Sequence, residues 1–573
     1  MFQQDPQSVG DSLALSALCA LIPLAVLFLL LGGLKIRAWV SGLISLLVAL
    51  VVAVVLFGMP LGQGISAAVD GGLFGFFPIL WIVINAVWIY NLTVASGHFD
   101  VLRRSFEKVS PDQRVQAIII AFCFGALLEA LAGFGTPVAI SVVMLMSLGF
   151  KPVKAATVAL VANTAPVAFG ALAIPIVTLA PIAAGVTDDP RLSDANALHT
   201  LGSMVGRQTP ILALVVPLIL VFIVDGRRGV RQTWLPALLA GAVFAIAQFV
   251  TANFISVQLT DIVASLLAAG SLVLLVRVWQ PAETLSAEPA EESVAARSSG
   301  KRATPSGGTT TATGGAAGEA GRPSVNNRAD VLRAYAPYLV IIVIFSLANI
   351  PAVVDFLGKE PFTHLFDWPG LDIQNAAGAP VVTQFKFNWL PAAGTLLVIA
   401  GLITMLILKV SPSRALKTYG ATYVELRSAI ITVMAVLGLA YVMNLSGQTA
   451  SLGAWLAGTG GFFAILSPIL GWIGVAVTGS DTSSNSLFGA LQVQAAAKAG
   501  LDPVLMAAAN SSGGVLGKMV SPQNLAIAAG AVGMSGQEGE IFRKVIGWSL
   551  LLLVLMCLIV GLQATPVLSW MIP

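Results

Sequence analysis

The sequence predicts an all-α polytopic membrane protein, with about twelve transmembrane helices and two re-entrant helical hairpins in an inverted repeat. Apolar residues make up 57% of the 573-residue chain and charged residues only 10%, whereas soluble domains carry about 25% charged residues. Uncharged runs of roughly twenty residues recur along the chain, and this is the length that an α-helix needs to cross a hydrocarbon core about 30 Å thick.

Twelve apolar runs are expected to cross the membrane. Those of the N-terminal half are Leu13–Gly33, Ala38–Gly58, Leu73–Ser96, Ala155–Pro175, Ile211–Asp225, Trp234–Phe254 and Leu259–Val276. Those of the C-terminal half are Tyr335–Phe356, Trp389–Lys409, Ala429–Leu452, Leu501–Ala531 and Ile546–Leu568. The first run follows no basic segment and carries no small-residue cleavage site, so we expect it to be retained as a span.

Two further regions, Ala117–Gly149 and Gly461–Gly500, are apolar at both ends but polar at the centre, over Gly133–Pro137 and Gly479–Asn485. Each pattern predicts a helical hairpin with a polar tip. Irregular backbone at membrane depth is tolerated only where protein or a water-filled cavity satisfies it, so each tip is expected at a site. The alternative for each region is two ordinary crossings joined by a short loop.

The stretch 280–330 is rich in Ala, Gly, Ser, Thr, Pro and Glu and has no apolar periodicity, which predicts a disordered cytoplasmic linker. It separates an N-terminal membrane half, 1–279, from a C-terminal half, 331–573. With both hairpins re-entrant, the basic clusters between spans all fall on one side of the membrane. That side is the cytoplasm, so both termini and the Lys359–Lys386 loop are expected outside. A regulatory tail is the alternative to a plain tether.

Short motifs recur in the two halves at similar spacing. The pairs are Gly133–Thr136 with Gly479–Thr482, Gly149–Pro152 with Gly500–Pro503, Asn163 with Asn510, Gly170 with Gly517, and Pro175 with Pro522. The first copy follows a span that starts outside and the second a span that starts inside, so the copies are inverted. Transporters built from inverted repeats bind substrate near the midplane, between broken helices. Chance similarity of Gly- and Pro-rich helices is the alternative.

Composition and charge exclude several classes of protein. The net charge of +3 is small and the basic residues are scattered, so no nucleic-acid partner is expected. The cysteines lie in apolar runs without paired or metal-type spacing, so neither a disulfide nor a metal site is predicted: Cys19, Cys123 and Cys557. The histidines lie in polar stretches, which excludes paired haem ligands in a helix bundle: His98, His199 and His364. We expect membrane lipids and small solutes as partners and no cofactor; homo-oligomerisation is left open.

Three segments closely resemble the bacterial lactate permease family: Leu127–Ile140, Val477–Asn485 and Asn510–Asn524. The resemblance covers nearly the whole chain except the linker, which is atypical for the family. It implies a multi-pass protein of the bacterial cytoplasmic membrane that moves lactate, and in some cases glycolate, together with protons. It also implies paired re-entrant hairpins, because the family is grouped with carriers that use them.

Polar side chains cluster at the two tips and in the helices that follow. A 2-hydroxycarboxylate offers one carboxylate and one hydroxyl, whose water must be replaced by fixed donors such as helix N-termini and hydroxyls. Any one of these residues alone fits helix packing, and only the cluster indicates binding. The candidate substrate-binding residues are Gly133, Gly135, Thr136, Asn163, Thr164, Thr482, Ser483, Ser484, Asn485, Asn510, Ser511, Ser512 and Lys518.

Only Glu129, Asp481 and Lys518 are expected deep within apolar segments, where ionisable groups are costly and mark function. Lys518 is interpreted as a partner of the substrate carboxylate or of Asp481. Glu129 or Asp481 is the expected proton carrier, and we favour Glu129 because its neighbours along the chain are apolar. In the alternative interpretation, Lys518 extends to the inner interface and Asp481 caps the second arm of its hairpin.

Two other functions are compatible with a polytopic chain. The first is an antiporter or symporter for another organic anion, such as a dicarboxylate or a gluconate-like acid; a single cationic side chain favours a monocarboxylate. The second is a channel or a membrane-embedded enzyme, which would require pore-lining rings, metal-ligand clusters or a nucleophile with its base. The sequence has none of these patterns, so we do not expect an enzyme.

Overall fold

The computed structural model describes the chain except for Lys35, Lys108, Phe134, Asp194, 286–327, Asn349, Ala377, Val382 and 535–536. Most of the predicted linker therefore lies outside the described residues. Within the described part, eleven helices are long and apolar enough to cross a membrane, against about twelve expected. The expected run Trp389–Lys409 forms a shorter helix, α15 (Ala393–Ile407), which is not among the eleven. The prediction of an all-α polytopic fold is confirmed.

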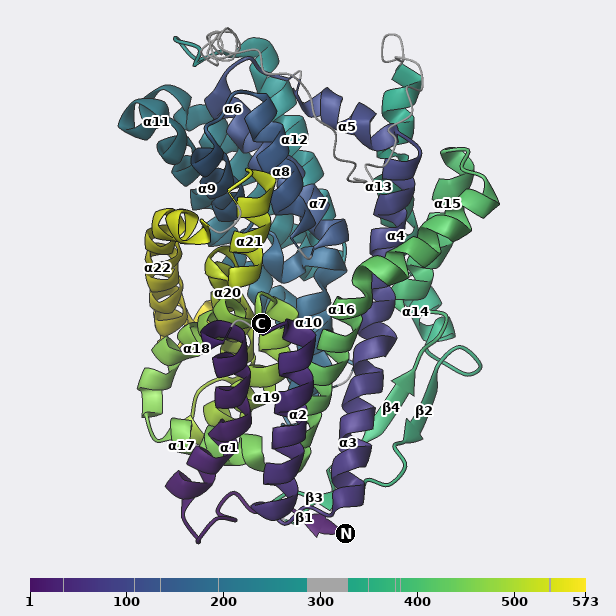
Figure 1. The fold of residues 1–573 in the computed structure, drawn as a ribbon, viewed down its shortest axis with the longest axis vertical. Coiled ribbons are helices and arrows are strands. Elements are labelled where there is room, and N and C mark those ends of the chain that lie inside the picture. Colours follow the sequence, from purple (N-terminus) through teal and green to yellow (C-terminus); the bar gives the residue numbers. More distant parts are fainter. Residues whose placement is uncertain are drawn as a thin grey trace, which may run out of the picture.

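The first part of the chain forms five helices before the first hairpin. They are α1 (Leu13–Phe28), α2 (Ala38–Val55), α3 (Leu61–Phe74), α4 (Trp81–Ala95) and α5 (His98–Glu107). The stretch Gly75–Leu80 joins α3 to α4, and its helical geometry is interrupted at Phe77, which has extended backbone angles. Helices α1, α2 and α3 stand side by side in the lower part of the molecule (Figure 1), and α2 and α3 both pack against α16 (Pro412–Leu445).

The first repeat is a hairpin followed by a broken helix. Its helices are α6 (Gln113–Ala117), the π-helix Ile118–Phe124, α7 (Gly125–Ala132), α8 (Thr136–Ser147), α9 (Pro152–Ala162) and α10 (Gly170–Ala184). The unbroken span expected over Ala155–Pro175 is wrong, because the helix stops at Ala162 and a separate helix begins at Gly170. Pro166 lies in this gap, where its ring and missing N–H disfavour a continuous helix.

The second repeat has the same order of elements. They are α18 (Phe463–Thr478), α19 (Asp481–Ala499), α20 (Pro503–Gly517), the 3₁₀ turn Lys518–Val520 and α21 (Pro522–Ala531). The unbroken span expected over Leu501–Ala531 is likewise wrong. Ser521 caps α21, and Pro522 occupies the first position of that helix, which proline favours.

Both hairpins turn through a glycine in the left-handed region, Gly135 at φ +85° and Gly479 at φ +76°. Residues with a Cβ rarely adopt this conformation, which explains glycine at the two tips. Helix α21 packs against α8, while Arg191, just after α10, forms an ion pair of 2.9 Å with Asp502, just before α20. The last helix of the second repeat thus lies against the second arm of the first hairpin, and the segment after α10 lies near the start of α20. The inverted order of the two copies stays a prediction.

The remaining helices complete the bundle. They are α11 (Ala197–Phe254), α12 (Thr260–Val278), α13 (Arg328–Ala348), α14 (Pro351–Leu357), α17 (Gln448–Ala457) and α22 (Glu538–Gln563). Two expected spans, Ile211–Asp225 and Trp234–Phe254, lie within α11, which changes direction at Gly226 and Thr233. Short 3₁₀ turns link several of these elements.

Four short strands form two small sheets. Strand β1 (Phe2–Gln3) pairs in parallel with β3 (Ile373–Gln374), and β2 (His364–Asp367) pairs antiparallel with β4 (Gln384–Phe387). The first sheet ties the N-terminus to the loop that precedes α15. The basic-residue pattern predicts both segments on the same, outer side, and the pairing agrees with this.

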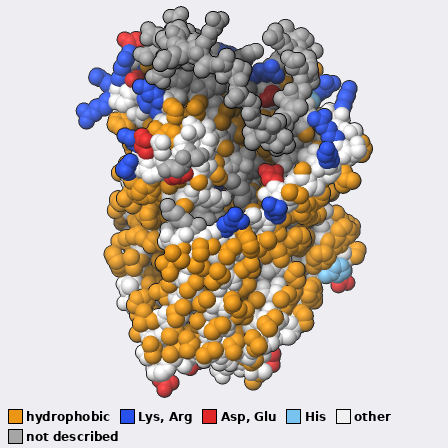
Figure 2. Space-filling view, in the orientation of Figure 1, with side chains coloured by type: hydrophobic (Ala, Val, Ile, Leu, Met, Phe, Trp, Pro, Cys, Tyr) orange, Lys and Arg blue, Asp and Glu red, His pale blue; other side chains and the backbone are white. Residues whose placement is uncertain are grey.

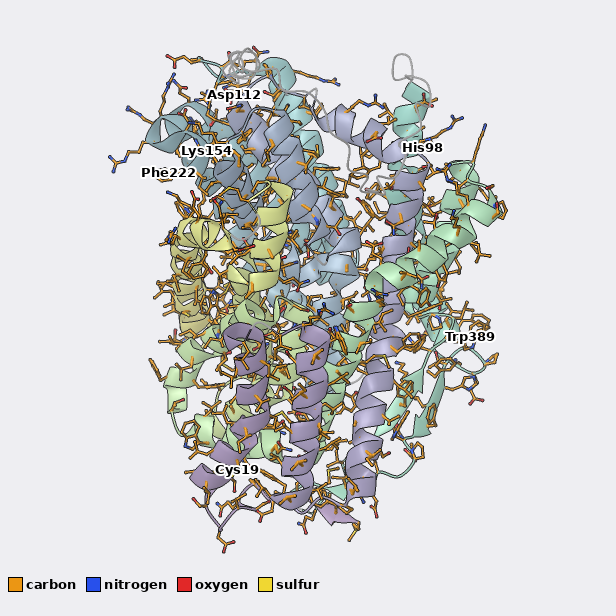
Figure 3. The ribbon with its side chains drawn as sticks, viewed as in Figure 1. Cys19, His98, Asp112, Lys154, Phe222 and Trp389 are labelled. Carbon is orange, nitrogen blue, oxygen red and sulfur yellow. The ribbon has the colours of Figure 1, made fainter. Side chains whose placement is uncertain are left out.

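Charged and apolar side chains separate along the long axis. Lys and Arg gather at the upper end in Figure 2, whereas apolar side chains cover the lower part. His98, Asp112 and Lys154 lie toward the upper end and Cys19 toward the opposite end (Figure 3). The positive-inside rule assigns the upper end to the cytoplasm. The re-entrant course of the hairpins stays a prediction, since their first arms, Gln113–Leu131 and Gly460–Thr478, are each long enough to cross a bilayer.

Candidate functional site

The two hairpin tips line a single cavity of about 730 Å³. The first tip contributes Gly133 and Thr136, and the second contributes the stretch from Thr478 to Ser483. The broken helices add backbone and side chains at their gaps, among them Gly170 and Lys518. The sequence predicts that each tip lies at a site; it did not predict the gaps in the helices that follow.

Lys518 and Glu129 form a buried ion pair in the wall of this cavity. The Lys518 Nζ donates to Glu129 Oε1 at 2.5 Å, and the two side chains are 8% and 3% exposed. Asn163 Nδ2 donates to the other carboxylate oxygen at 2.9 Å. Removing one partner from a buried pair costs about 3–5 kcal/mol, because it leaves the other charge uncompensated. The pair therefore links the first hairpin to the broken helix of the second repeat.

Glycines make room for the two carboxylates. A Cβ on Gly170 would lie 2.8 Å from Glu129 Oε1, and a Cβ on Gly514 would lie 2.4 Å from Asp481 Oδ1. Real Cβ atoms do not approach an oxygen this closely. Gly170, one of the matched repeat positions, is therefore needed for the Glu129 carboxylate to sit at the gap in the broken helix.

Asp481 begins α19 at the second tip and is 3% exposed. Its Oδ2 accepts a hydrogen bond of 2.6 Å from Ser511 Oγ, while its Oδ1 has no hydrogen-bond partner in the described part of the chain. The alternative that Asp481 caps the helix is wrong, because the cap is Ser480, whose Oγ accepts from the Ser483 backbone N–H. Nor does Lys518 pair with Asp481, since its bonded carboxylate is Glu129.

The predicted site residues divide into two groups. Those that line the cavity are Glu129, Gly133, Thr136, Asp481, Thr482, Ser483 and Lys518. The others do not line the cavity. Gly135 forms the first turn, Thr164 donates to Val161 O, and Ser484 donates to Gly471 O. Ser511 donates to Asp481, Ser512 donates to Gln208 Oε1, and Asn163, Asn485 and Asn510 bond neighbouring side chains or backbone. These groups position the site in the structure rather than face the cavity.

An amide relay joins the second hairpin to the first repeat. Asn510 Nδ2 donates to Asn485 Oδ1 at 2.9 Å, and Asn485 Nδ2 donates to the Pro175 carbonyl at 3.0 Å. Gln492 Nε2 donates to Asn510 Oδ1 at 3.1 Å. Buried amides are costly unless paired, so this relay holds the two repeats in a fixed arrangement around the cavity.

Sequence reasoning missed several residues of functional interest. Arg37, Glu425 and Arg427 also line the cavity, but the arginines looked like ordinary loop cations. The expectation that only three ionisable groups lie deep is wrong, because Asp70 and Asp261 are 6% and 1% exposed. Asp261 lies near the start of an apolar run, so the hydropathy pattern placed it at the end of a span and not deep within one.

The site offers one ammonium and several hydroxyls to an anion, and two carboxylates that can exchange protons. Among the described residues, no group of three or more His, Cys, Asp or Glu side chains could hold a metal ion. Lys518, Glu129 and Asp481 all line the cavity.

Known proteins match the chain over almost its whole length. The family model described as L-lactate permease matches residues 16–567. A glycolate permease of Escherichia coli (strain K12) is 42% identical over 96% of both chains. An L-lactate permease of the same organism is 40% identical over 100% of both chains, and one of Bacillus subtilis (strain 168) is 39% identical over 99% of this chain and 98% of its own. These relatives are named permeases rather than enzymes. The chain, a multi-pass integral protein of the cell membrane, thus belongs to the L-lactate permease family.

Proposed function

We propose that the chain carries lactate, or glycolate, across the cytoplasmic membrane in symport with protons. The observation that carries the proposal is the buried Lys518–Glu129 pair in the wall of a cavity formed by both repeats. The printed names of the relatives, L-lactate permease and glycolate permease, supply the substrate class. Both anions are small 2-hydroxymonocarboxylates, which need one cation and a few hydroxyl partners.

In the proposed cycle, the substrate carboxylate replaces Glu129 on Lys518. The substrate hydroxyl then bonds to polar groups of the tips, for which Thr136, Thr482 and Ser483 are available. Glu129, released from its cation, is left in a buried position where an ionised carboxylate is costly. It takes up a proton, so that substrate and proton are bound together and released together.

Asp481 is the second candidate for the proton. It lines the same cavity, is buried, and has one carboxylate oxygen without a hydrogen-bond partner among the described residues. The Ser511 hydroxyl donates to its other oxygen. A proton on Oδ1 would relieve the cost of the isolated charge, while the Ser511 bond would persist.

The test is uptake by proteoliposomes under an imposed proton gradient. Lactate, glycolate, pyruvate and succinate are compared at equal concentration, with inward-acid and outward-acid gradients. We expect lactate and glycolate to accumulate when the outside is acid, and succinate to be carried poorly, because Lys518 is the one cation among the described cavity residues that the two repeats contribute. Accumulation of succinate or gluconate in exchange for an internal anion, insensitive to pH, would support the antiporter instead.

A further inference from the structure

The cavity lining has a second set of cationic groups besides Lys518. Arg37 lies at the N-terminus of α2 and Arg427 lies within α16, and both side chains line the cavity. Both are exposed, and neither has an ion-pair partner among the described residues. Glu425, which also lines the cavity, accepts a hydrogen bond of 3.1 Å from Asn91 Nδ2. Two guanidinium groups are thus open to an incoming anion.

The position of these arginines along their helices places them near one edge of the bilayer. The rise from Arg37, the N-cap of α2, to Val55 and the rise from Arg427 to Leu445, the end of α16, are each about 27 Å at 1.5 Å per residue. This length is close to the thickness of the hydrocarbon core. The two helices pack together, with Gly42 of α2 against Ala435 of α16. Both arginines therefore lie near one edge of the bilayer, which the basic-residue pattern assigns to the cytoplasm.

We propose that Arg37 and Arg427 form a second anion-binding site at the cytoplasmic mouth, which holds a small carboxylate on its way to or from Lys518. The ligand class of this second site is taken from the proposed function, on which this proposal rests. Guanidinium groups bind carboxylates through paired hydrogen bonds, and cations that line a cavity raise the local concentration of anions. At about 730 Å³ the cavity is far larger than a single three-carbon anion, so both sites can be filled at once.

The competing explanation is that these are interfacial arginines of the kind that the positive-inside rule predicts. Helix α16 provides the comparison, because Arg414 lies on the same helix and is exposed but does not line the cavity. If the arginines act only as interfacial cations that aid membrane insertion, replacing Arg414 should have the same effect as replacing Arg427. An effect on anion binding would be confined to the cavity wall.

The experiment measures initial rates of lactate and glycolate transport separately from each face, in right-side-out and inside-out vesicles. The variants are Arg37→Gln, Arg427→Gln and the double variant, with Arg414→Gln as control. We expect KM measured from the cytoplasmic face to rise about tenfold in the double variant, the effect of losing one charge-assisted hydrogen bond. We expect kcat, and KM from the outer face, to stay within about twofold, because Lys518 is intact.

Ionic strength provides a second measurement. The cytoplasmic KM of the wild type should rise with salt more steeply than that of the double variant, since salt screens exposed charges. Arg427→Lys should keep part of the salt dependence but less of the affinity, because lysine lacks the paired donors. An unchanged cytoplasmic KM in the double variant, or an equal rise in Arg414→Gln, would overturn the second site and leave the proposed function standing. If the wild type carries neither anion from either face, the proposed function fails, and with it a mouth site for that ligand class.

Discussion

Lys518 and Glu129 meet at 2.5 Å although 389 residues separate them in the chain. One belongs to the broken helix of the second repeat and the other to the hairpin of the first. The contact therefore forms only when both halves of the protein are folded together. In the proposed cycle the contact also breaks each time substrate enters. The same ion pair therefore contributes both to folding and to transport.

The first prediction separates these two roles of Lys518. Lys518→Ala leaves Glu129 buried without its cation, so we expect loss of stability as well as loss of lactate binding. The double variant Lys518→Ala/Glu129→Gln removes both charges, and its melting temperature should recover toward that of the wild type. Lactate binding, measured by calorimetry on purified protein, should not recover. Lys498→Ala, an exposed lysine on α19, is the control; recovery of binding in the double variant would refute the anchoring role.

The second prediction concerns topology. In a cysteine-free background, Arg228→Cys in α11 should be labelled only from the cytoplasm and Gln384→Cys in β4 only from outside. Thr136→Cys and Thr482→Cys, one at each tip, should react slowly and be protected by lactate, because both positions line the cavity. Labelling of Arg228→Cys and Gln384→Cys from the same face would contradict the predicted topology. Tips that react as fast as an open loop would contradict the re-entrant arrangement.

The sequence could predict the helical fold and the two glycine turns because these depend on local signals. Long apolar runs predict spans, and the glycines at positions 135 and 479 mark turns that side chains disfavour. Pro166 and Pro522 each fall where a span expected to be continuous is broken. That breakage was missed because the surrounding residues are apolar, so hydropathy alone showed a single run.

The contacts of the site could not be predicted in the same way. Glu129 has apolar neighbours along the chain, yet its oxygens face Lys518 and Asn163, which come from distant segments. Arg427 looked like a loop cation because the expected span begins after it, at Ala429, whereas α16 already begins at Pro412. Pairing across hundreds of residues is set by packing of the two repeats, and no local pattern carries that information.

The third prediction concerns the linker, which we expect to act as a tether. Deleting residues 287–323 should leave transport nearly unchanged, because the segment lacks the apolar residues needed for a core. The start of the linker is different: Leu285 N donates to Asp112 Oδ2 at 3.0 Å, and Glu283 pairs with Arg228. A matched deletion of 281–323 removes these contacts and should lower the melting temperature. Loss of uptake in the shorter deletion, at normal abundance in the membrane, would show a further role.

The fourth prediction concerns Asp261, on α12 away from the cavity lining. Its Oδ1 accepts from Gln248 Nε2 at 2.9 Å, and its Oδ2 has no hydrogen-bond partner among the described residues. An isolated buried anion is costly, so Asp261→Asn should preserve transport within about twofold and keep stability. Asp261→Ala should lower stability by about 1–3 kcal/mol, because the Gln248 amide loses its acceptor. Loss of gradient-driven accumulation in Asp261→Asn would instead place this residue on the proton path.

The fifth prediction assigns the proton carrier among the carboxylates of the cavity. In Glu129→Gln the side chain keeps its shape but cannot take up a proton, so lactate accumulation driven by acid outside should stop. Exchange of labelled for unlabelled lactate should persist, because binding to Lys518 needs no proton on residue 129. Asp481→Asn keeps an acceptor for the Ser511 hydroxyl and is the matched comparison.

These two variants give different results under the two models. If Glu129 is the carrier, Glu129→Gln loses accumulation and Asp481→Asn keeps it, and the reverse pattern assigns the proton to Asp481. Both measurements use the same proteoliposomes, with exchange as the control for folding and orientation. If both neutral variants still concentrate lactate in response to acid outside, neither carboxylate is the carrier. Coupling would then run through co-transported water or hydronium, or through a sodium ion, and replacing sodium with choline in the same assay would test the last of these.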